Sequence, residues 1–269
     1  MFTSVTKTRK LKHLLDSMGS VLISLSGGVD SALLLHIASE TLKEKVKAIT
    51  FTSPIFSRND LISAENIAKK LKIDHIKIKF DILAESDFSK NDKMRCHFCK
   101  MKMIEELKKE SNKRGIKHIA DGNNIDDIKE YRPGLDLAQK SGIQSPFIEA
   151  GLDKNDIRQE AKKRNMEIWN MPSSACLASR IAYGTYINED ILSIIEKGEA
   201  LLHQLGFKEV RMRYHPPIAR IEVSKNEIGR LAELPIRDKV VKAFKELGVT
   251  YTALDLSGFR SGSMNDVLY

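Results

Sequence analysis

The first two thirds of the chain alternate short apolar runs with longer stretches of helical periodicity. The apolar runs are VLISLS, VKAITFT, HIKIKF and KHIADG, and the helical stretches include DSALLLHIASETLKE, LISAENIAKKLK, KMKMIEELKKESNKRG and KNDIRQEAKKRN. Such alternation is typical of βαβ units, in which crossover helices join parallel strands. From residue 21 to about 170 the pattern predicts an α/β fold with a parallel sheet flanked by helices.

The order of elements changes around residues 172–185, where the segment PSSACLASRIAYG lies. Beyond it the pattern predicts a helix over 188–205, strands in KEVRMRYH and IARIEVS, two helices, and a last strand in YTALDLSG. This order fits a small α+β domain. We therefore expect a larger domain over residues 1–180, which carries the cysteines, and a smaller one over residues 181–269.

Composition narrows the class of protein. With 269 residues, of which 42% are hydrophobic, the chain has ample material for a core. Three cysteines, a start without a charged-then-apolar leader, and no apolar run near the roughly 18 residues of a membrane span predict a reduced, cytosolic protein with no membrane partner. The net charge of +8 fits either a solvated lysine-rich surface or a preference for anionic ligands.

The strongest local signal is the stretch VLISLSGGVDSALLLHIA, in which an apolar strand runs through residues 26–31 directly into a helix. Two adjacent glycines allow a tight turn with inward N–H groups, and the helix N-terminus adds partial positive charge. The loop therefore predicts a phosphate-binding site, although a plain glycine turn with Asp30 and Ser31 capping the helix is the alternative. The spacings of a Walker loop and of a dinucleotide site are both absent from the sequence.

The motif S-G-G-x-D-S after a first strand resembles the PP-loop of ATP pyrophosphatases, which adenylylate a carbonyl or carboxylate oxygen and release pyrophosphate. The resemblance implies that Asp30 assists Mg²⁺ and that the β and γ phosphates of ATP are held by Ser26, Gly27, Gly28 and Ser31. Thr52 and Ser53 end the second predicted strand and are candidates to contact adenine through their backbone. Asp126 and Asp127, after DGNN, are candidates for Mg²⁺ or for capping a helix.

The three cysteines bear on which nucleophile attacks the adenylate. Cys96 and Cys99 form a C-x-x-C pair in MRCHFCKMKM, and Cys176 stands alone. Three thiolates can hold a cubane iron–sulfur cluster and leave one iron open for an exogenous sulfide. A zinc site with His97 or His118 as the fourth ligand, or a redox or structural role for the pair, are the alternatives.

Four longer segments narrow the resemblance to one family within the PP-loop superfamily. They are MPSSACLASRIAYGTYI, GNNIDDIKEYRPG, VRMRYHPPIARIEV and DLSGFRSGSMN. They resemble the LarE family, ATP-dependent pyridinium-3,5-biscarboxylic acid mononucleotide sulfurtransferases that build the nickel-pincer nucleotide of lactate racemase. In its best-known branch the cysteine of A-C-L-A-S-R, here Cys176, gives up its own sulfur. The added Cys96 and Cys99 resemble the branch in which three cysteines ligate a [4Fe-4S] cluster that carries the transferred sulfide. The source of that sulfide is open, and Pro216 stands where the family has glycine.

Candidate substrate-binding residues lie mainly in the second predicted domain. Arg211 and Arg213 are two apart on a predicted strand, so both guanidinium groups project from one face and can bind a substrate phosphate; ordinary surface ion pairs are the alternative. Ser179 and Arg180, beside Cys176, can bind the same anion or the carboxylates of the pyridinium substrate. The family resemblance adds three further positions and implies a homohexamer built through the small domain; these positions are Glu199, Glu222 and Arg260.

Two other functions compete with this interpretation. A PP-loop tRNA thiolase can also use three cysteines and a [4Fe-4S] cluster, and the basic charge favours it. The sequence has no RNA-binding domain before the loop and no terminal pairs of C-x-x-C knuckles, which argues against a nucleic-acid partner. The second alternative is a non-catalytic redox or metal sensor on an ATP-binding scaffold.

Overall fold

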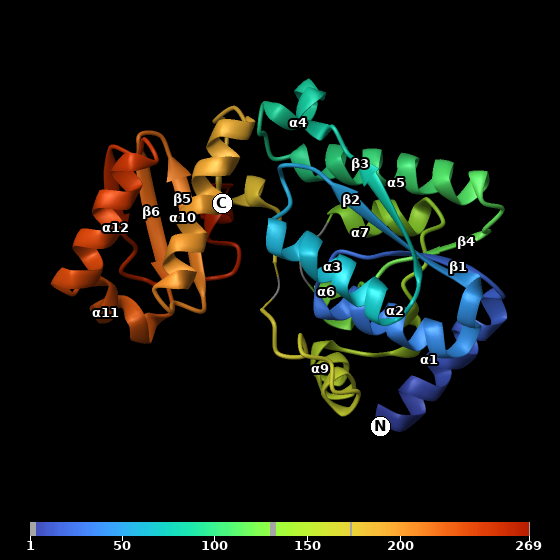
Figure 1. Cartoon of the computed structure of the whole chain (residues 1–269). Helices are drawn as coiled ribbons and strands as arrows, with labels where there is room; N and C mark the ends of the chain where they lie inside the picture. Colours follow the sequence, from blue (N-terminus) through green and yellow to red (C-terminus); the bar gives the residue numbers. More distant parts are fainter. Residues whose placement is uncertain (1–3, 130–132, 173, 269) are drawn as a thin grey trace. The chain divides into compact units, whose positions relative to one another are not determined.

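The computed structural model describes residues 4–129, 133–172 and 174–268 (Figure 1). Residues 130–132 of the segment GNNIDDIKEYRPG and residue 173 of MPSSACLASRIAYGTYI lie outside the described residues. The chain forms two compact units: the first comprises Met1–Ile82 and Cys96–Ser174, and the second comprises Leu83–Arg95 and Ala175–Tyr269. The domain boundary expected between residues 180 and 181 stays a prediction.

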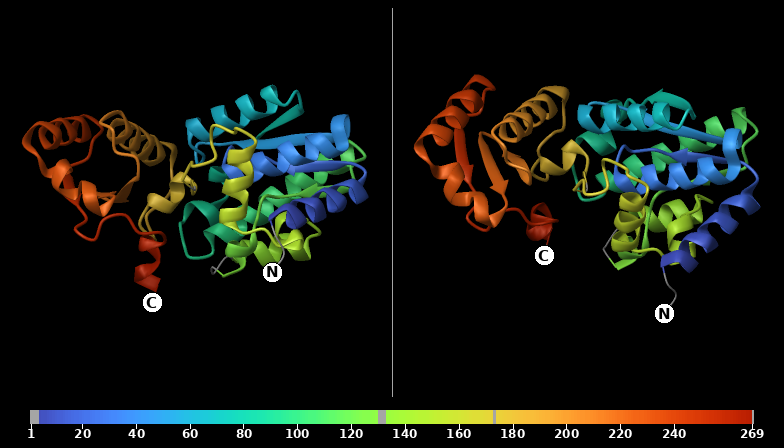
Figure 2. Two further views of the ribbon diagram at one scale, coloured as in Figure 1. Left: turned by 90° about the horizontal axis from the view of Figure 1, so that it is seen from below. Right: turned by 60° about the horizontal axis from the view of Figure 1, so that its bottom comes forward.

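The first unit is an α/β structure. Its four strands are ordered β3-β2-β1-β4, and all neighbouring pairs are parallel, as the sequence predicts; Val21, for example, is opposite Val46 on one side and His118 on the other. Helices flank this sheet (Figure 2). The elements are α1 (Ser4–Met18), β1 (Val21–Ser24), α2 (Val29–Leu42), β2 (Val46–Thr52), α3 (Arg58–Lys70), β3 (Asp74–Lys79), α5 (Arg95–Lys113), β4 (His118–Ala120), α6 (Ile125–Lys129), α7 (Pro133–Lys140), α8 (Pro146–Ala150) and α9 (Lys154–Lys163).

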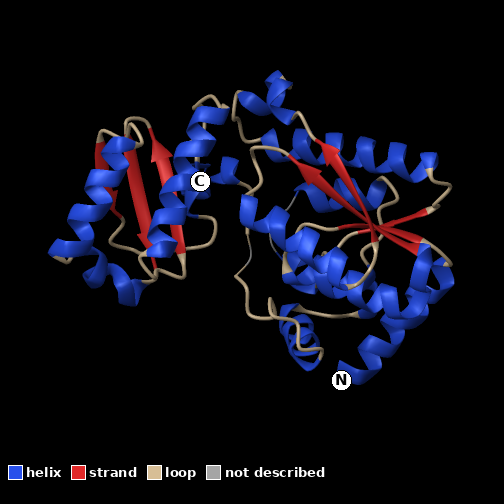
Figure 3. Ribbon diagram, in the orientation of Figure 1, coloured by secondary structure: helices blue, strands red, loops and turns tan. Residues whose placement is uncertain are grey.

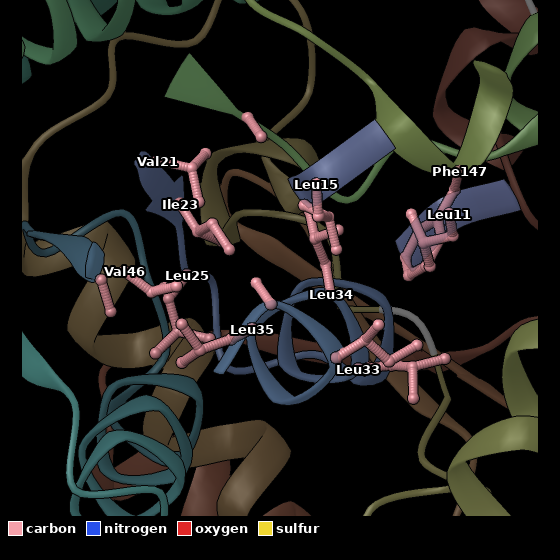
Figure 4. Packing of buried hydrophobic residues seen from close by; sticks show 14 of the residues in the cluster. Leu11, Leu15, Val21, Ile23, Leu25, Leu33, Leu34, Leu35, Val46 and Phe147 are labelled. Carbon is pink, nitrogen blue, oxygen red and sulfur yellow. The ribbon is translucent and has the colours of Figure 1, made fainter. Parts of the chain in front are cut away.

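Burial explains why the strands of the first unit differ in composition. The central strand β1 is apolar and buried at three of its four positions, because helices cover a parallel sheet on both faces. The edge strand β3 has a single buried position, Ile76. Figure 4 shows the core where side chains of α1, β1, α2 and α8 meet, among them Leu11, Leu15, Leu34 and Phe147. Helix α1 was not among the helices predicted from the sequence.

The second unit is a small α+β structure around a mixed sheet (Figure 3). Strands β5 and β6 are antiparallel, whereas β6 and β7 are parallel. Met212 on β5 and Phe244 of α12 both pack against Gly198 of α10, so closely that a Cβ on the glycine would lie 2.3 Å from the methionine sulfur. The elements are α4 (Ser86–Ser89), α10 (Glu189–Gln204), β5 (Val210–His215), β6 (Ile218–Val223), α11 (Ile228–Ala232), α12 (Leu234–Glu246) and β7 (Tyr251–Leu254).

The segment Leu83–Arg95 is fixed inside the second unit by a buried asparagine. Asn91 Nδ2 donates to the carbonyl oxygens of Ala182 (2.8 Å) and Thr185 (3.0 Å), and its backbone carbonyl accepts from the Gly184 N–H (3.0 Å). Arg95 donates to Asn91 Oδ1, and its guanidinium carbon lies 4.7 Å from the centre of the Tyr183 ring. The residue that precedes Cys96 is therefore anchored to the segment that follows Cys176.

Among the helices of the described ranges, none combines the length and the hydrophobicity that a bilayer span requires.

Candidate functional site

The loop of residues 26–31 joins β1 to α2 and is held by hydrogen bonds among its own residues. The Ser26 N–H donates to Ser31 Oγ (3.1 Å), and the two serine hydroxyl oxygens lie 3.1 Å apart. Ser31 Oγ lies 3.2 Å from the Gly28 carbonyl oxygen, to which it can donate. Gly28 is the extended residue before α2, so the first N–H groups of the helix follow the turn directly. Backbone N–H groups and hydroxyls gathered at a helix N-terminus can bind an anion.

Two glycines allow neighbouring backbone to pack against this loop. Gly27 has φ +86°, and a Cβ there would lie 2.1 Å from the Asp60 carbonyl oxygen. Ser63 Oγ donates to the Gly27 carbonyl oxygen (2.8 Å), so α3 supports the loop from this side. On another side a Cβ on Gly122, which follows β4, would lie 2.7 Å from the Ser31 nitrogen. The loop is thus held between α3 and the end of β4.

Asp30 is the acidic residue of the loop, and it forms an ion pair with Lys154 of α9. Its Oδ1 is buried and accepts no hydrogen bond from the residues that the structure describes. Burial raises the pKa of Asp30, Lys154 opposes this rise, and the negative charge of Asp127 adds to it. Asp127 Oδ2 also accepts from the Asn124 N–H (2.8 Å) at the start of α6. The structure therefore gives Asp127 a capping contact and electrostatic proximity to Asp30.

The predicted adenine contacts lie at the end of β2. Thr52 lines a pocket of about 260 Å³ together with Thr50, Leu61, Glu65 and Lys77. Thr50 Oγ1 donates to the carbonyl of Leu25, the residue just before the loop (2.7 Å). Ser53 is buried, and its Oγ has no hydrogen-bond partner within the described ranges. This pocket is therefore beside the strand that leads into the phosphate-binding loop, and adenine contact stays a prediction.

The C-x-x-C pair lies in the first two turns of α5. Residues three apart on a helix are on the same face, so the thiols of Cys96, which is exposed, and Cys99, which is half-buried, can approach one ligand together. The next residue, Lys100, pairs with Asp121 at the end of β4 (3.5 Å). Cys176 is half-buried and belongs to the second unit, where its carbonyl oxygen accepts from Arg180 Nη1 (3.1 Å).

The described residues contain no group of three or more histidine, cysteine, aspartate or glutamate side chains that could hold a metal ion. The cluster expected on Cys96, Cys99 and Cys176 therefore stays a prediction.

Two buried ion pairs organise the predicted substrate-binding residues of the second unit. Arg180 Nε and Nη2 donate to the two carboxylate oxygens of Glu199 (3.0 and 3.2 Å). Arg213 Nε and Nη2 both donate to Glu222 Oε2 (3.0 and 2.8 Å). Ser179 Oγ accepts from Arg180 Nη1 (3.0 Å). Both glutamates thus hold arginines in place, and a direct contact with substrate or metal stays a prediction for them.

Arg211 differs from these two arginines. It is half-buried, its guanidinium carbon lies 5.1 Å from the centre of the Phe259 ring, and burial together with the positive charges of Arg180 and Arg213 lowers its pKa to about 10. An anion placed near Arg211 would relieve this repulsion. Arg260, in contrast, is exposed and pairs with the exposed Asp266 (2.9 Å).

Sequence reasoning missed three residues that complete these sites. Lys154 pairs with Asp30, and Asp121 accepts from Ser145 Oγ (2.8 Å) and pairs with Lys100. In the second unit Ser263 donates to Glu222 Oε1 (2.7 Å). For Asp121 and Ser263 a signal existed, since both lie in segments quoted for the strand KHIADG and for DLSGFRSGSMN. Nothing local to the sequence distinguishes Lys154 from the other lysines.

Known proteins match either part of this chain or nearly all of it. A family model described as asparagine synthase matches residues 9–90, which contain the loop. A probable tRNA sulfurtransferase from Methanobrevibacter smithii is 26% identical over 175 residues, 61% of this chain and 46% of that protein. An uncharacterized protein from Synechocystis sp. is 32% identical over 263 residues, which are 98% of each chain.

A further relative with a named activity also matches from end to end. Pyridinium-3,5-bisthiocarboxylic acid mononucleotide synthase from Lactiplantibacillus plantarum is 33% identical over 269 residues, 100% of this chain and 97% of that protein. The family indicated by the sequence motifs is thereby confirmed. Because this match covers the whole chain, the chain belongs to the LarE family of PP-loop sulfurtransferases.

Proposed function

We propose that this protein adenylylates a carboxylate of pyridinium-3,5-biscarboxylic acid mononucleotide and converts it to a thiocarboxylate, as a step in the biosynthesis of the nickel-pincer nucleotide. The observation that carries this proposal is the identity of 33% to a bisthiocarboxylic acid mononucleotide synthase over the whole chain. The geometry of the loop at residues 26–31 supports the use of ATP, since it offers backbone N–H groups and hydroxyls at a helix N-terminus.

The first unit fits ATP and Mg²⁺. The buried Asp30 Oδ1, which lacks a hydrogen-bond partner among described residues, is an oxygen ligand of the kind that Mg²⁺ prefers. Ser26, Gly27, Gly28 and Ser31 would hold phosphate oxygens, and Thr52 and Ser53 would border the adenine. When bound, MgATP supplies an electrophilic phosphorus to which a substrate carboxylate can be joined, with pyrophosphate leaving. The protein's own part is to hold the phosphates and to exclude water.

The second unit offers positive charge for an anionic nucleotide. Arg180 and Arg213 are fixed by Glu199 and Glu222, so their remaining donors are oriented without loss of side-chain freedom on binding. Arg211 carries a charge that its surroundings oppose, so a substrate phosphate would stabilise it. Ser179 beside them supplies a hydroxyl, and the exposed Arg260 is the least constrained member of the set.

For sulfur delivery we propose that Cys96, Cys99 and Cys176 ligate one [4Fe-4S] cluster. The donor chemistry fits, because three thiolates are available and two of them share a helix face. Such a cluster would supply an open iron that carries sulfide, whose donor is unknown. Transfer of that sulfide would form a C–S bond at the adenylylated carboxyl carbon and break its C–O bond to AMP. The alternative is that Cys176 is itself the sulfur donor and is consumed.

Pyrophosphate release tests the activation step. With ATP, Mg²⁺ and the biscarboxylic acid mononucleotide, we expect pyrophosphate and AMP from the wild type and neither from Asp30→Asn, whose circular dichroism should match that of the wild type. Release of ADP and phosphate instead would overturn the assignment of the reaction.

The source of sulfur is tested by anaerobic purification and mass spectrometry. If the cluster is present, the protein should be brown with about four irons per chain, and each single Cys→Ala change should bleach it. Added sulfide should then support several turnovers, and Cys176 should keep its mass. Loss of the mass of H₂S at Cys176 after one turnover would show that the cysteine is the donor.

A tRNA thiolase is the second candidate, favoured by the 26% identity to a probable tRNA sulfurtransferase over 175 residues. Binding to bulk tRNA at increasing salt separates the two, since contacts with many phosphates give a steep loss of affinity. We expect no such binding.

We also propose a homohexamer formed through the second unit, and a monomeric mass in sedimentation at micromolar concentration would contradict it.

A further inference from the structure

Lys154 lies where a cation would balance the acidic residue of the phosphate-binding loop. Its ammonium group pairs with Asp30 Oδ2, and 124 residues of chain separate the two. The other oxygen of the same carboxylate, Oδ1, is buried and has no hydrogen-bond partner in the described part of the chain. One half of the carboxylate is thus neutralised by the protein itself, and the other half retains its capacity for a ligand.

The backbone of Lys154 is fixed, whereas its side chain can move. Lys154 is the first residue of α9, which begins with a capping box formed by Asp153 and Asp156. The Lys154 N–H donates to Asp126 Oδ2 (3.0 Å), so the helix start is also tied to α6. The ammonium group is at the end of a flexible four-carbon stem, and the side chain as a whole is a quarter exposed. It can therefore change partner while the helix stays in place.

A second cation of the same helix also acts on Asp30. Arg158 is four residues after Lys154, which puts the two side chains on one face of α9. Its charge lowers the pKa of Asp30, and its Nε is buried without a hydrogen-bond partner among the described residues. This face of α9 therefore presents positive charge toward the loop, where it can meet phosphate oxygens as well as a carboxylate.

We propose that Lys154 is an exchangeable counter-ion for Asp30: it occupies the carboxylate until a divalent cation arrives with a nucleotide, and then turns to a phosphate oxygen. The inference rests on the proposed function for the nature of the nucleotide. It makes Lys154 a positioning residue for the metal and a binding residue for the phosphates. The consequence is that a divalent cation binds Asp30 poorly by itself and well together with ATP. Binding of the metal ion before the nucleotide is thereby reduced.

Binding of Mn²⁺ without nucleotide tests the exchange directly, with the free ion measured by electron paramagnetic resonance. Lys154→Gln should bind Mn²⁺ about tenfold more tightly than the wild type, because a positive charge in contact with Asp30 is removed. Lys163→Gln is the matched control, since Lys163 is on the same helix, is 56% exposed and pairs with Glu160 (3.8 Å). It should bind Mn²⁺ as the wild type does, and Asp30→Asn added to Lys154→Gln should abolish the gain.

Affinity for ATP in the presence of Mg²⁺ tests the second half of the exchange. Calorimetry should show a Kd about tenfold or more higher for Lys154→Gln than for Lys163→Gln, because a phosphate contact is lost. Lys154→Met, which keeps the apolar stem, repeats both measurements if the glutamine variant does not fold. If Mn²⁺ binding in the Lys154 variants equals that of the control, the exchange is overturned.

The outcome is independent of sulfur transfer. If the wild type makes no pyrophosphate with the biscarboxylic acid mononucleotide but Lys154→Gln gains Mn²⁺ affinity and loses ATP affinity, the exchange stands and the proposed substrate fails. If pyrophosphate is made and neither affinity changes, the substrate stands and the exchange fails.

Discussion

The two units each present a candidate anion site, and they build it in opposite ways. In the first unit six consecutive residues, 26–31, supply backbone N–H groups and hydroxyls that bond to one another. In the second unit the donors are charged side chains brought from separate segments and held by buried glutamates. The first site requires residues without a Cβ at Gly27 and Gly122. The second requires the negative charges of Glu199 and Glu222, which balance its arginines. The two sites should therefore fail under different substitutions.

The largest effect is expected at Glu222 in the second unit. Glu222 is fully buried, accepts hydrogen bonds from Arg213 and Ser263, and forms an ion pair with Arg220. Glu222→Gln removes the charge that balances a buried arginine and should lower the free energy of unfolding by about 3–5 kcal/mol, measured by urea denaturation. Glu227→Gln is the control, because its pair with Arg230 (3.1 Å) is partly exposed and should contribute at most about 1 kcal/mol. Equal losses in the two variants would contradict the contrast.

The next effect is expected at Gly27 in the first unit. Gly27→Ala places a Cβ on the Asp60 carbonyl oxygen and puts alanine at φ +86°, which together should cost about 2 kcal/mol or more of unfolding free energy. Gly28→Ala tests the same chemistry one residue on, where φ is −80° and the new Cβ would lie 3.6 Å from Ser26 Oγ. Its cost should stay under about 1 kcal/mol. A thermal melt of both variants that shows no difference would remove the steric argument.

A smaller effect, of opposite sign, is expected at Arg211. Because burial and two neighbouring arginines lower its pKa to about 10, charged Arg211 destabilises the fold; this penalty is fully present below pH 10 and is lost as pH rises toward the pKa of an unfolded arginine. Arg211→Gln should therefore leave stability at neutral pH unchanged or raise it. Inorganic phosphate should raise the melting temperature of the wild type more than that of Arg211→Gln. A marked destabilisation by Arg211→Gln would show that the charge is already balanced.

The smallest effect is expected at the exposed pair of Arg260 and Asp266, whose side chains are 44% and 56% exposed. Asp266→Asn should change the free energy of unfolding by no more than about 0.5 kcal/mol, because water screens the pair. A loss as large as that of Glu222→Gln would place Arg260 inside the buried network.

The sequence was informative where structure is local. The strand, the loop at 26–31 and the following helix are contiguous, so their hydrophobic pattern and glycines predict the turn and its anion-binding capacity. The parallel sheet follows from the alternation of elements in the same way. The ion pairs of Arg180 and Arg213 could not be predicted from spacing, because their partners lie on other elements; Glu199 and Glu222 were found only by family resemblance. Lys154, 124 residues from Asp30, left no local signal.

The anchoring of Leu83–Arg95 by Asn91 bears on how the second unit could be separated from the first. The chain enters the second unit at Leu83, leaves it after Arg95 and returns at Ala175, so no single cut releases it. A fragment of residues 175–269 would lack the Asn91 amide, and the carbonyl groups of Ala182 and Thr185 would lose their donor. The second unit is therefore not a detachable module. A transplantable version would need its two pieces spliced by a designed linker, and a gene fusion that copied only the C-terminal piece would transfer an incomplete unit.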